Sequence, residues 1–188
     1  KALNCAKSEV SFDNDNIKLE VADVNRPDLL SVEGIARQCK LALGIITGLQ
    51  KYTAKKTNYK IKASSKNRPL IVSAVVKNIR FDNESIKSII QLQEKLCEVF
   101  GRKRKEAALG IYDFDKIKFP LTYKDVEPDK IKFIPLDYGK EMTGREIITR
   151  HPTGIAYKHL LENEKNFPLL LDADNEVLSM PPIINSNY

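Results

Sequence analysis

Hydrophobic and polar residues recur along this chain with two different periods, which predict both strands and helices. Apolar positions alternate with charged ones over 17–21, and the apolar run over 70–76 is typical of a buried central strand. Helical spacing follows over 28–43 and 83–100, and a glycine comes directly after each stretch. Further strands are predicted over 59–63, 107–112, 168–171 and 176–180, and short helices from 143 and over 157–162. This irregular alternation favours an α+β fold with mixed sheets and packed helices.

Local sequence signals predict where several of these elements begin. Asn25–Asp28 breaks the first strand and opens a helix, with Pro27 tolerated in its first turn. Asp82 and Asn83 are N-cap candidates for the second helix, and Thr143–Glu146 has capping-box spacing. Gln93 is a polar residue on the apolar stripe of the second helix. It marks either the edge of the helix or a side chain that faces a polar cavity.

Charge and cysteine content narrow the classes of function only modestly. Lys and Arg total 31 against 25 Asp and Glu, a net charge of +6 that permits contact with a polyanion without requiring it. The basic residues concentrate over 55–68 and 102–105. Cys5, Cys39 and Cys97 are odd in number and widely spaced, which argues against a disulfide framework or a zinc site. No apolar run is long enough for a bilayer-spanning helix, and a chain that starts with Lys is expected to begin upstream.

Known catalytic motifs do not explain this sequence. His151 and His159 lie outside any metal-binding motif, and the chain has no serine-hydrolase elbow, phosphate-binding loop or dinucleotide glycine pattern. Asp113 and Asp115 fit the start of a loop better than a carboxylate pair. The segment 172–175 fits a hairpin turn better than a calcium loop, because it lacks the glycine and the distal glutamate. Residue chemistry alone thus indicates a mildly basic α+β domain of no particular enzyme class.

Four segments together resemble the β chain of archaeal and eukaryal phenylalanyl-tRNA synthetases. They read NRPDLLSVEG over 25–34, QLQEK over 91–95, GIYDFD over 110–115 and LSMPPIINS over 178–186. The resemblance covers essentially the whole chain. It implies part of an N-terminal domain over 1–50, a basic linker and strand over 51–68, and a tRNA-editing domain over 69–188 that continues past Tyr188.

The resemblance implies that this region hydrolyses tyrosine wrongly esterified to tRNA(Phe). An aminoacylation pocket built for phenylalanine rejects an added hydroxyl by a factor of only about 10². A second site that hydrogen-bonds the tyrosine hydroxyl discriminates better, because phenylalanine would leave its buried polar groups unpaired. The site residues implied by the resemblance are catalytic Gln93, Glu94 and Asn185, substrate-binding Leu170 and Ser179, and tRNA-binding Arg104. Plain structural roles remain open for Leu170 as core, Arg104 as a solvated charge and Ser179 as a strand-end hydroxyl.

The expected mechanism is attack of a positioned water on the aminoacyl ester, since the motifs contain no nucleophile–base pair. Glu94 or Asn185 is expected to orient the water, and Gln93 or Ser179 to contact the substrate. Two alternatives are a non-catalytic module that binds tRNA or another subunit, and a free-standing editing hydrolase. No cofactor or metal is expected in this region, whereas the resemblance implies ATP and magnesium in other domains of the parent. It also implies a cytoplasmic α2β2 heterotetramer with an α subunit and tRNA(Phe) as partners.

Overall fold

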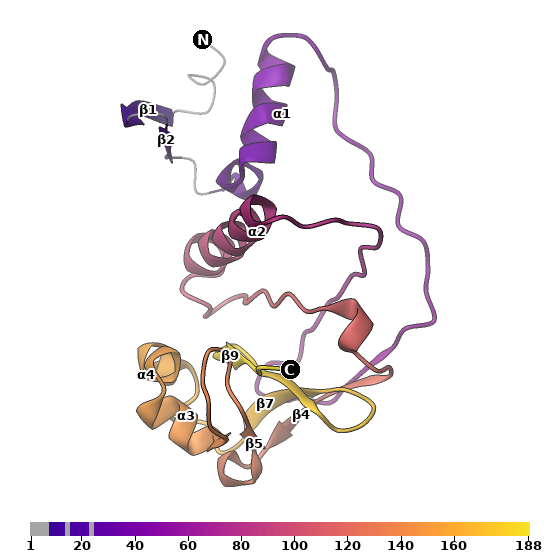
Figure 1. The fold of residues 1–188 in the computed structure, drawn as a ribbon, viewed down its shortest axis with the longest axis vertical. Helices are drawn as coiled ribbons and strands as arrows, with labels where there is room; N and C mark the ends of the chain where they lie inside the picture. The colour runs from indigo at the N-terminus through magenta and orange to yellow at the C-terminus, as the bar shows by residue number, and fades with distance from the viewer. Residues whose placement is uncertain (1–7, 14–15, 23–24) are drawn as a thin grey trace. The chain divides into compact units, whose positions relative to one another are not determined.

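The computed structural model describes residues 8–13, 16–22 and 25–188, which form two compact units that interleave along the chain. The first unit comprises Lys1–Lys55 and Ile79–Leu109, and the second comprises Lys56–Asn78 and Gly110–Tyr188. Figure 1 traces the chain through both units. The predicted domains, 1–50, 51–68 and 69–188, are each one continuous segment, whereas each unit combines two separate segments. The predicted domain boundaries stay a prediction. Cys5 lies outside the described residues.

The first unit begins with a two-stranded antiparallel sheet followed by a helix. Strands β1 (Ser8–Asp13) and β2 (Asn16–Val21) pair in register, and β2 confirms the strand predicted from alternation. The α-helix α1 (Val32–Ala42) starts later than predicted, because Ser31 is its N-cap and accepts a hydrogen bond from the Gly34 amide at 3.1 Å. Pro27–Leu30 instead forms a separate 3-10 helix, η2. Gly44 follows α1 with a φ of 70°, as a glycine after a helix commonly does.

The second helix of the first unit agrees with its sequence signals. Asp82 caps α2 (Asn83–Lys95) in a capping box with Ser85. A π-helical turn, η3 (Leu96–Phe100), continues α2 up to Gly101, and the Gly101 amide donates to the Leu96 carbonyl at 2.7 Å. The chain then reverses through three consecutive residues with positive φ at 102–104.

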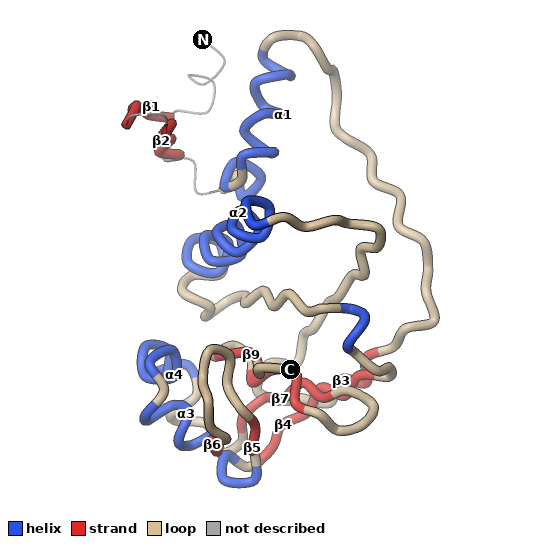
Figure 2. Tube along the Cα trace, in the orientation of Figure 1, coloured by secondary structure: helices blue, strands red, loops and turns tan. Residues whose placement is uncertain are grey.

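The second unit is built on a five-stranded mixed sheet with the order β3-β4-β7-β8-β9. Its strands are β3 (Ile61–Ala63), β4 (Leu121–Val126), β7 (Phe167–Leu171), β8 (Val177–Met180) and β9 (Ile184–Asn185). Strand β3 runs parallel to β4, and the other neighbours are antiparallel. Strands β7 and β8 confirm the predicted hairpin. Figure 2 shows these strands in red, with a long irregular segment between α1 and β3.

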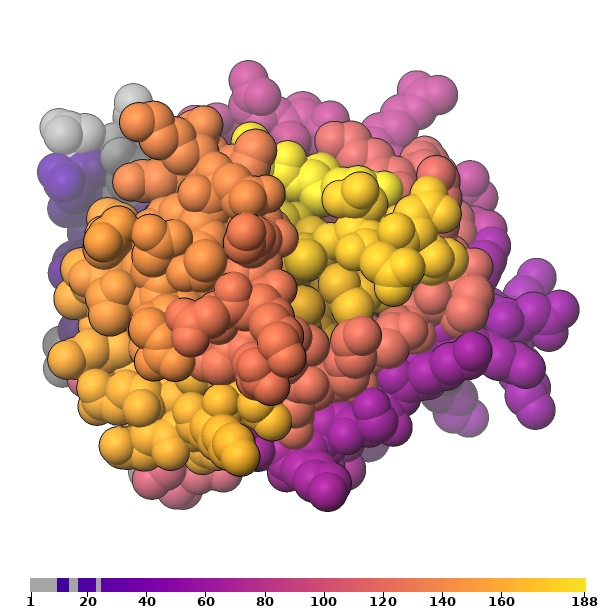
Figure 3. All heavy atoms as spheres, turned by 90° about the horizontal axis from the view of Figure 1, so that it is seen from below, coloured from indigo at the N-terminus to yellow at the C-terminus, as the bar shows by residue number. Residues whose placement is uncertain are grey.

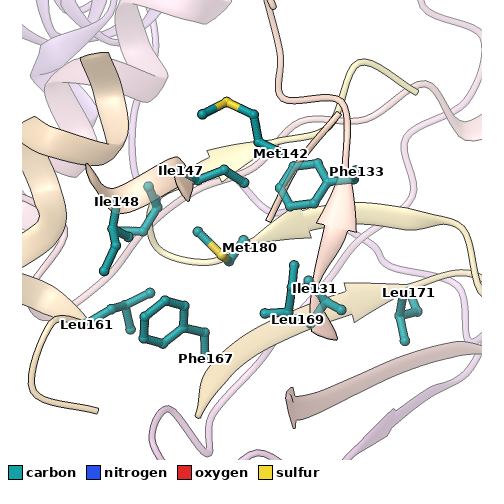
Figure 4. Close-up of a cluster of buried hydrophobic side chains, with 11 residues drawn as sticks. Ile131, Phe133, Met142, Ile147, Ile148, Leu161, Phe167, Leu169, Leu171 and Met180 are labelled. Carbon is teal, nitrogen blue, oxygen red and sulfur yellow. The ribbon is translucent and has the colours of Figure 1, made fainter. Parts of the chain in front are cut away.

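Short helices and a two-stranded sheet complete the second unit. They are η5 (Pro128–Lys130), β5 (Lys132–Phe133), β6 (Met142–Thr143), α3 (Gly144–Arg150), α4 (Pro152–Tyr157) and η6 (Lys158–Leu160), after η4 (Phe114–Lys116) earlier in the chain. The predicted capping box is confirmed, since Thr143 and Glu146 cap α3 reciprocally. Buried side chains of α3, β5, β7 and β8 converge in one core, with Met180 among Ile147, Phe167 and Leu169 (Figure 4). On one face the segment that contains α3 and α4, in orange, lies beside the yellow C-terminal segment (Figure 3).

Two predicted strands are wrong, although the predicted α+β class with mixed sheets is confirmed. Residues 70–76 form no helix or strand, and the side chains of Leu70 and Val72 are 91% and 96% exposed. An apolar run predicts burial, but a strand also requires a neighbouring strand with which to pair. Residues 107–112 are also irregular, and side-chain hydrogen bonds hold this segment instead of a ladder.

Candidate functional site

Three of the six predicted site residues lie in one row across neighbouring strands of the second unit. Ser179 on β8 is directly opposite Leu170 on β7 and directly opposite Asn185 on β9. Tyr123 on β4 extends the row on the other side of Leu170. Side chains at directly opposite positions lie on the same face of a sheet. The sheet therefore brings Leu170, Ser179 and Asn185 together on one face.

A β-bulge shapes this face at Leu178. Leu171 pairs with Val177 while Leu170 pairs with Ser179, so Leu178 is an extra residue in β8. Leu178 is buried, and it packs in one cluster with Leu170 and Tyr123. A bulge of this kind re-aims side chains and is frequent beside functional sites. Here it gives the row an apolar wall next to the polar Ser179.

The polar side chains of this row, Ser179 and Asn185, both lie next to the hydroxyl of a residue that sequence reasoning missed, Tyr112. The Tyr112 hydroxyl donates to Ser179 Oγ at 2.8 Å and lies 3.4 Å from Asn185 Oδ1. Ser179 is buried, whereas Tyr112 and Asn185 are half-buried. Burial raises the pKa of the Tyr112 phenol, and the hydrogen bond to Ser179 partly opposes the shift. Tyr112 therefore stays a protonated donor at neutral pH.

The signal that could have identified Tyr112 was present in the sequence. Tyr112 lies within the GIYDFD segment that carries the family resemblance. The hydrophobic pattern places Tyr112 only in a strand, and no residue type in the segment indicates a partner on β8. Its role depends on contacts between residues 67 positions apart, which periodicity cannot reveal.

Backbone hydrogen bonds fix the position of Asn185 at the edge of the row. The Asn185 carbonyl accepts from the Leu136 amide at 2.9 Å, and the Ser186 amide donates to the Leu178 carbonyl at 2.9 Å. Pro135 forms an isolated bridge with Ser186. The backbone on both sides of Asn185 is thus held from two directions, and the Asn185 side chain lies beside the Tyr112 hydroxyl.

The other three predicted site residues belong to the first unit. Gln93 Nε2 donates to the Leu109 carbonyl at 2.9 Å, and the Leu109 amide donates to Cys97 Sγ at 3.3 Å. Glu94 is exposed on α2. Arg104 lies in the positive-φ turn after η3, where its amide donates to the Cys97 carbonyl at 3.0 Å. The catalytic roles of Gln93 and Glu94 and the tRNA contact of Arg104 stay predictions.

Other candidate chemistry has structural explanations. His151 is buried, and its Nδ1 accepts from the Thr153 amide at 3.2 Å, so it caps α4. The Asp113 carboxylate accepts from the Asp115 amide at 3.1 Å at the start of a 3-10 turn. Asp172 closes the β7–β8 turn, as expected of a turn rather than a calcium loop. The described part of the chain contains no group of three or more His, Cys, Asp or Glu side chains that could bind a metal. Within that same part, no helix combines the length and apolarity needed to span a membrane.

Comparison with known proteins gives a consistent set of relatives. The chain is 48% identical over 189 residues to the phenylalanine–tRNA ligase β subunit of Pyrococcus horikoshii, with 98% of this chain and 34% of that protein covered. It is 50% identical over 163 residues to the β subunit of Methanococcus maripaludis, with 86% of this chain and 29% of that protein covered. The chain therefore spans about a third of the length of these relatives. No family model matches the chain.

A solved structure supports the same relationship. The crystal structure of an N-terminal fragment of the phenylalanyl-tRNA synthetase β subunit from Pyrococcus horikoshii matches with a TM-score of 0.90 and 46% sequence identity. The match covers 100% of this chain and 56% of that fragment. At this identity the two chains share their fold throughout.

Proposed function

Because the chain belongs to the family of phenylalanine–tRNA ligase β subunits, we propose that its second unit edits tRNA(Phe) that carries tyrosine. The observation that supports this proposal most directly is the row of Leu170, Ser179 and Asn185. Leu170 and the bulged Leu178 offer an apolar wall for an aromatic ring. Ser179 and Asn185 offer polar atoms at the end of that wall for the tyrosine hydroxyl.

The hydrogen bonds around Ser179 and Tyr112 suit recognition better than covalent catalysis. A serine nucleophile needs an adjacent base within hydrogen-bond reach. The bond between them runs from Tyr112 to Ser179, and the Tyr112 phenol, with its raised pKa, is not a base at neutral pH. We therefore assign Ser179 to the substrate hydroxyl and the hydrolytic step to a water. Asn185 can orient this water or contact the substrate.

The selectivity follows from the loss of hydrogen-bond partners. A tyrosyl group in this site would bond its hydroxyl to Ser179, whereas a phenylalanyl group would leave Ser179 without that partner. A lost hydrogen bond at a buried group costs about 1–3 kcal/mol, which corresponds to a factor of about 5 to 150 in rate or affinity. This discrimination adds to that of the synthetic site.

Deacylation of tRNA(Phe) carrying either tyrosine or phenylalanine tests the proposal in the full synthetase. Ser179→Ala is expected to reduce the preference for the tyrosyl ester about tenfold, by removing the acceptor for its hydroxyl. Ser73→Ala, at an exposed serine of the same unit, is the matched control and is expected to leave the preference unchanged. An unchanged preference in Ser179→Ala would remove Ser179 from substrate recognition.

Binding of tRNA without hydrolysis is the second candidate, and one observation in the first unit favours it. Arg102, Lys103 and Arg104 are consecutive and share positive φ values, and the turn leaves Arg102 and Lys103 exposed while Arg104 is half-buried. Clustered Lys and Arg side chains bind phosphates through a salt-dependent electrostatic attraction. If tRNA binding weakens in Lys103→Glu while the wild-type enzyme fails to deacylate tyrosyl-tRNA, the binding function replaces the editing function.

For the whole polypeptide we propose phenylalanine–tRNA ligase activity, which is the activity in the names of its relatives. We also propose an α subunit as its partner. An α2β2 assembly, and the use of ATP and magnesium by other domains of the parent protein, belong to this same proposal. The editing step proposed here uses a water and the side chains of the second unit, and the predicted catalytic roles of Gln93 and Glu94 stay predictions.

A further inference from the structure

Tyr112 occupies the position that the proposed substrate would take. Its ring packs against the apolar cluster that includes Leu170 and Leu178, and its hydroxyl donates to Ser179 Oγ at 2.8 Å. The same hydroxyl lies 3.4 Å from Asn185 Oδ1. These are the contacts that a tyrosyl side chain would make in this site, and the functional group is the same, a phenol.

The inward position of the Tyr112 ring depends on the glycine two residues before it. A Cβ atom added at Gly110 would lie 2.6 Å from the Tyr112 hydroxyl oxygen and 2.9 Å from the ring atoms Cε2 and Cζ. These distances are shorter than van der Waals contact, so a side chain at 110 would push the phenol outward. The glycine at 110 therefore leaves room for the phenol at Ser179 without any shift.

The segment around Tyr112 can release the ring without breaking a regular element. Residues 107–113 belong to no helix or strand, and the side chains of Ile111 and Asp113 are exposed. The next regular element, η4, begins at Phe114. Segments with few ladder hydrogen bonds and exposed neighbours open at a low free-energy cost.

We propose that Tyr112 is the resident occupant of a phenol-binding site formed by Ser179 and Asn185, and that the substrate must displace it. This inference rests on the proposed editing function for the identity of the displacing group, a tyrosyl ester. The displacement reduces the apparent affinity for every substrate by the fraction of molecules in which the site is open. The reduced apparent affinity thus protects correctly charged tRNA from hydrolysis, while Ser179 sets the preference for tyrosine.

Because Tyr112 affects the affinity for both substrates and Ser179 affects the ratio between them, kinetics of the full synthetase can test the proposal. Tyr112→Phe removes the hydroxyl that holds the ring at Ser179, and Gly110→Ala pushes the ring outward. Each variant is expected to lower KM for deacylation of tyrosyl- and phenylalanyl-tRNA(Phe) by the same factor, up to about tenfold for the lost hydrogen bond. The ratio between the two substrates and kcat are expected to stay constant.

Matched controls and a purely structural role give different results. Gly139→Ala adds a Cβ where no atom lies within 4 Å, and Tyr52→Phe removes the hydroxyl of an exposed tyrosine, so both are expected to match the wild type. A structural role for Tyr112 would lower kcat or stability in Tyr112→Phe without lowering KM. A change in the ratio between substrates would show that Tyr112 contacts the substrate. Either result would overturn the proposal.

Displacement can also be observed without hydrolysis. In crystals of the full synthetase soaked with p-cresol, the phenol of a tyrosine side chain, the cresol hydroxyl is expected at Ser179 Oγ and the Tyr112 ring outside the site. A Tyr112 ring that stays at Ser179 in saturating p-cresol would overturn the proposal. If the wild-type enzyme does not deacylate tyrosyl-tRNA, the editing function fails, and this structural result still decides the role of Tyr112.

Discussion

Gln93 Nε2 donates to the carbonyl oxygen of Leu109 at 2.9 Å, which explains the polar residue on an otherwise apolar helix stripe. Cys97, one helical turn later, accepts from the Leu109 amide. Two side chains of the same helical segment therefore hold both backbone polar groups of Leu109. The first unit uses Gln93 to hold the chain directly before Gly110.

Substitution of Gln93 is therefore expected to weaken the first unit. Gln93→Ala leaves the Leu109 carbonyl without this donor, which costs about 1 kcal/mol of unfolding free energy. Urea unfolding of the chain followed by circular dichroism measures the change. Gln91→Ala, at an exposed position on the same helix, is the control. Equal stability of the two variants would show that the hydrogen bond contributes nothing.

The Tyr112 phenol is expected to ionise late in an alkaline titration. Burial raises its pKa above the ordinary value of 10.0, with the Ser179 hydrogen bond opposing the shift. A pKa raised by folding contributes stability that is present below about pH 10 and is lost as pH rises through the folded pKa. In an alkaline titration followed by the ultraviolet absorbance of phenolate, Tyr112→Phe should therefore show one late-titrating tyrosine fewer than the wild type. Loss of an early-titrating tyrosine instead would contradict the buried position.

Asp172 is expected to be the most sensitive residue of the β7–β8 turn. Its buried carboxylate oxygen Oδ1 accepts from the amides of Asp174 at 2.8 Å and Glu176 at 3.0 Å. Asp172→Ala removes both bonds and is expected to destabilise the second unit by about 1–3 kcal/mol. Asp172→Asn keeps the Oδ1 acceptor and should retain most of the stability. Thermal unfolding tests this order, and equal losses in the two variants would contradict it.

Gly34 is expected to tolerate no side chain. An added Cβ would lie 1.5 Å from the Asp28 carbonyl oxygen, an atom of the backbone that cannot rotate away. Gly34→Ala therefore has to separate α1 from η2, and overpacking of this kind costs about 1–3 kcal/mol or more. Gly139→Ala, in open space, provides the control in the same thermal unfolding assay. A wild-type melting temperature for Gly34→Ala would show that η2 does not pack against α1 as described.

Local chemistry made several elements predictable from sequence. Asp82 and Thr143 cap the helices that they were expected to cap, because capping depends on residues only three positions apart. The β7–β8 hairpin was predictable for the same reason, since Asp172 forms its turn with nearby amides. The start of α1 was misplaced because Pro27 is compatible with either a 3-10 or an α-helical first turn.

Long-range pairing was not predictable from the chain alone. The apolar run over 70–76 was expected in a sheet, but periodicity does not show whether a partner strand exists. The row of Leu170, Ser179 and Asn185 depends on a bulge at Leu178, and hydrophobic alternation does not show such a bulge. The family resemblance supplied these three residues, and the sheet register supplies the reason why they lie together.

Deacylation of tyrosyl-tRNA(Phe) by the full synthetase tests the central claim most directly. The wild-type enzyme is compared with the double variant Ser179→Ala/Asn185→Ala, and with Ser73→Ala/Asn187→Ala at exposed positions of the same unit as the control. Rapid hydrolysis by the wild type and the control, with a loss of tyrosine preference of tenfold or more in the double variant, is the expected result. An unchanged preference in the double variant would contradict a recognition site at Ser179 and Asn185.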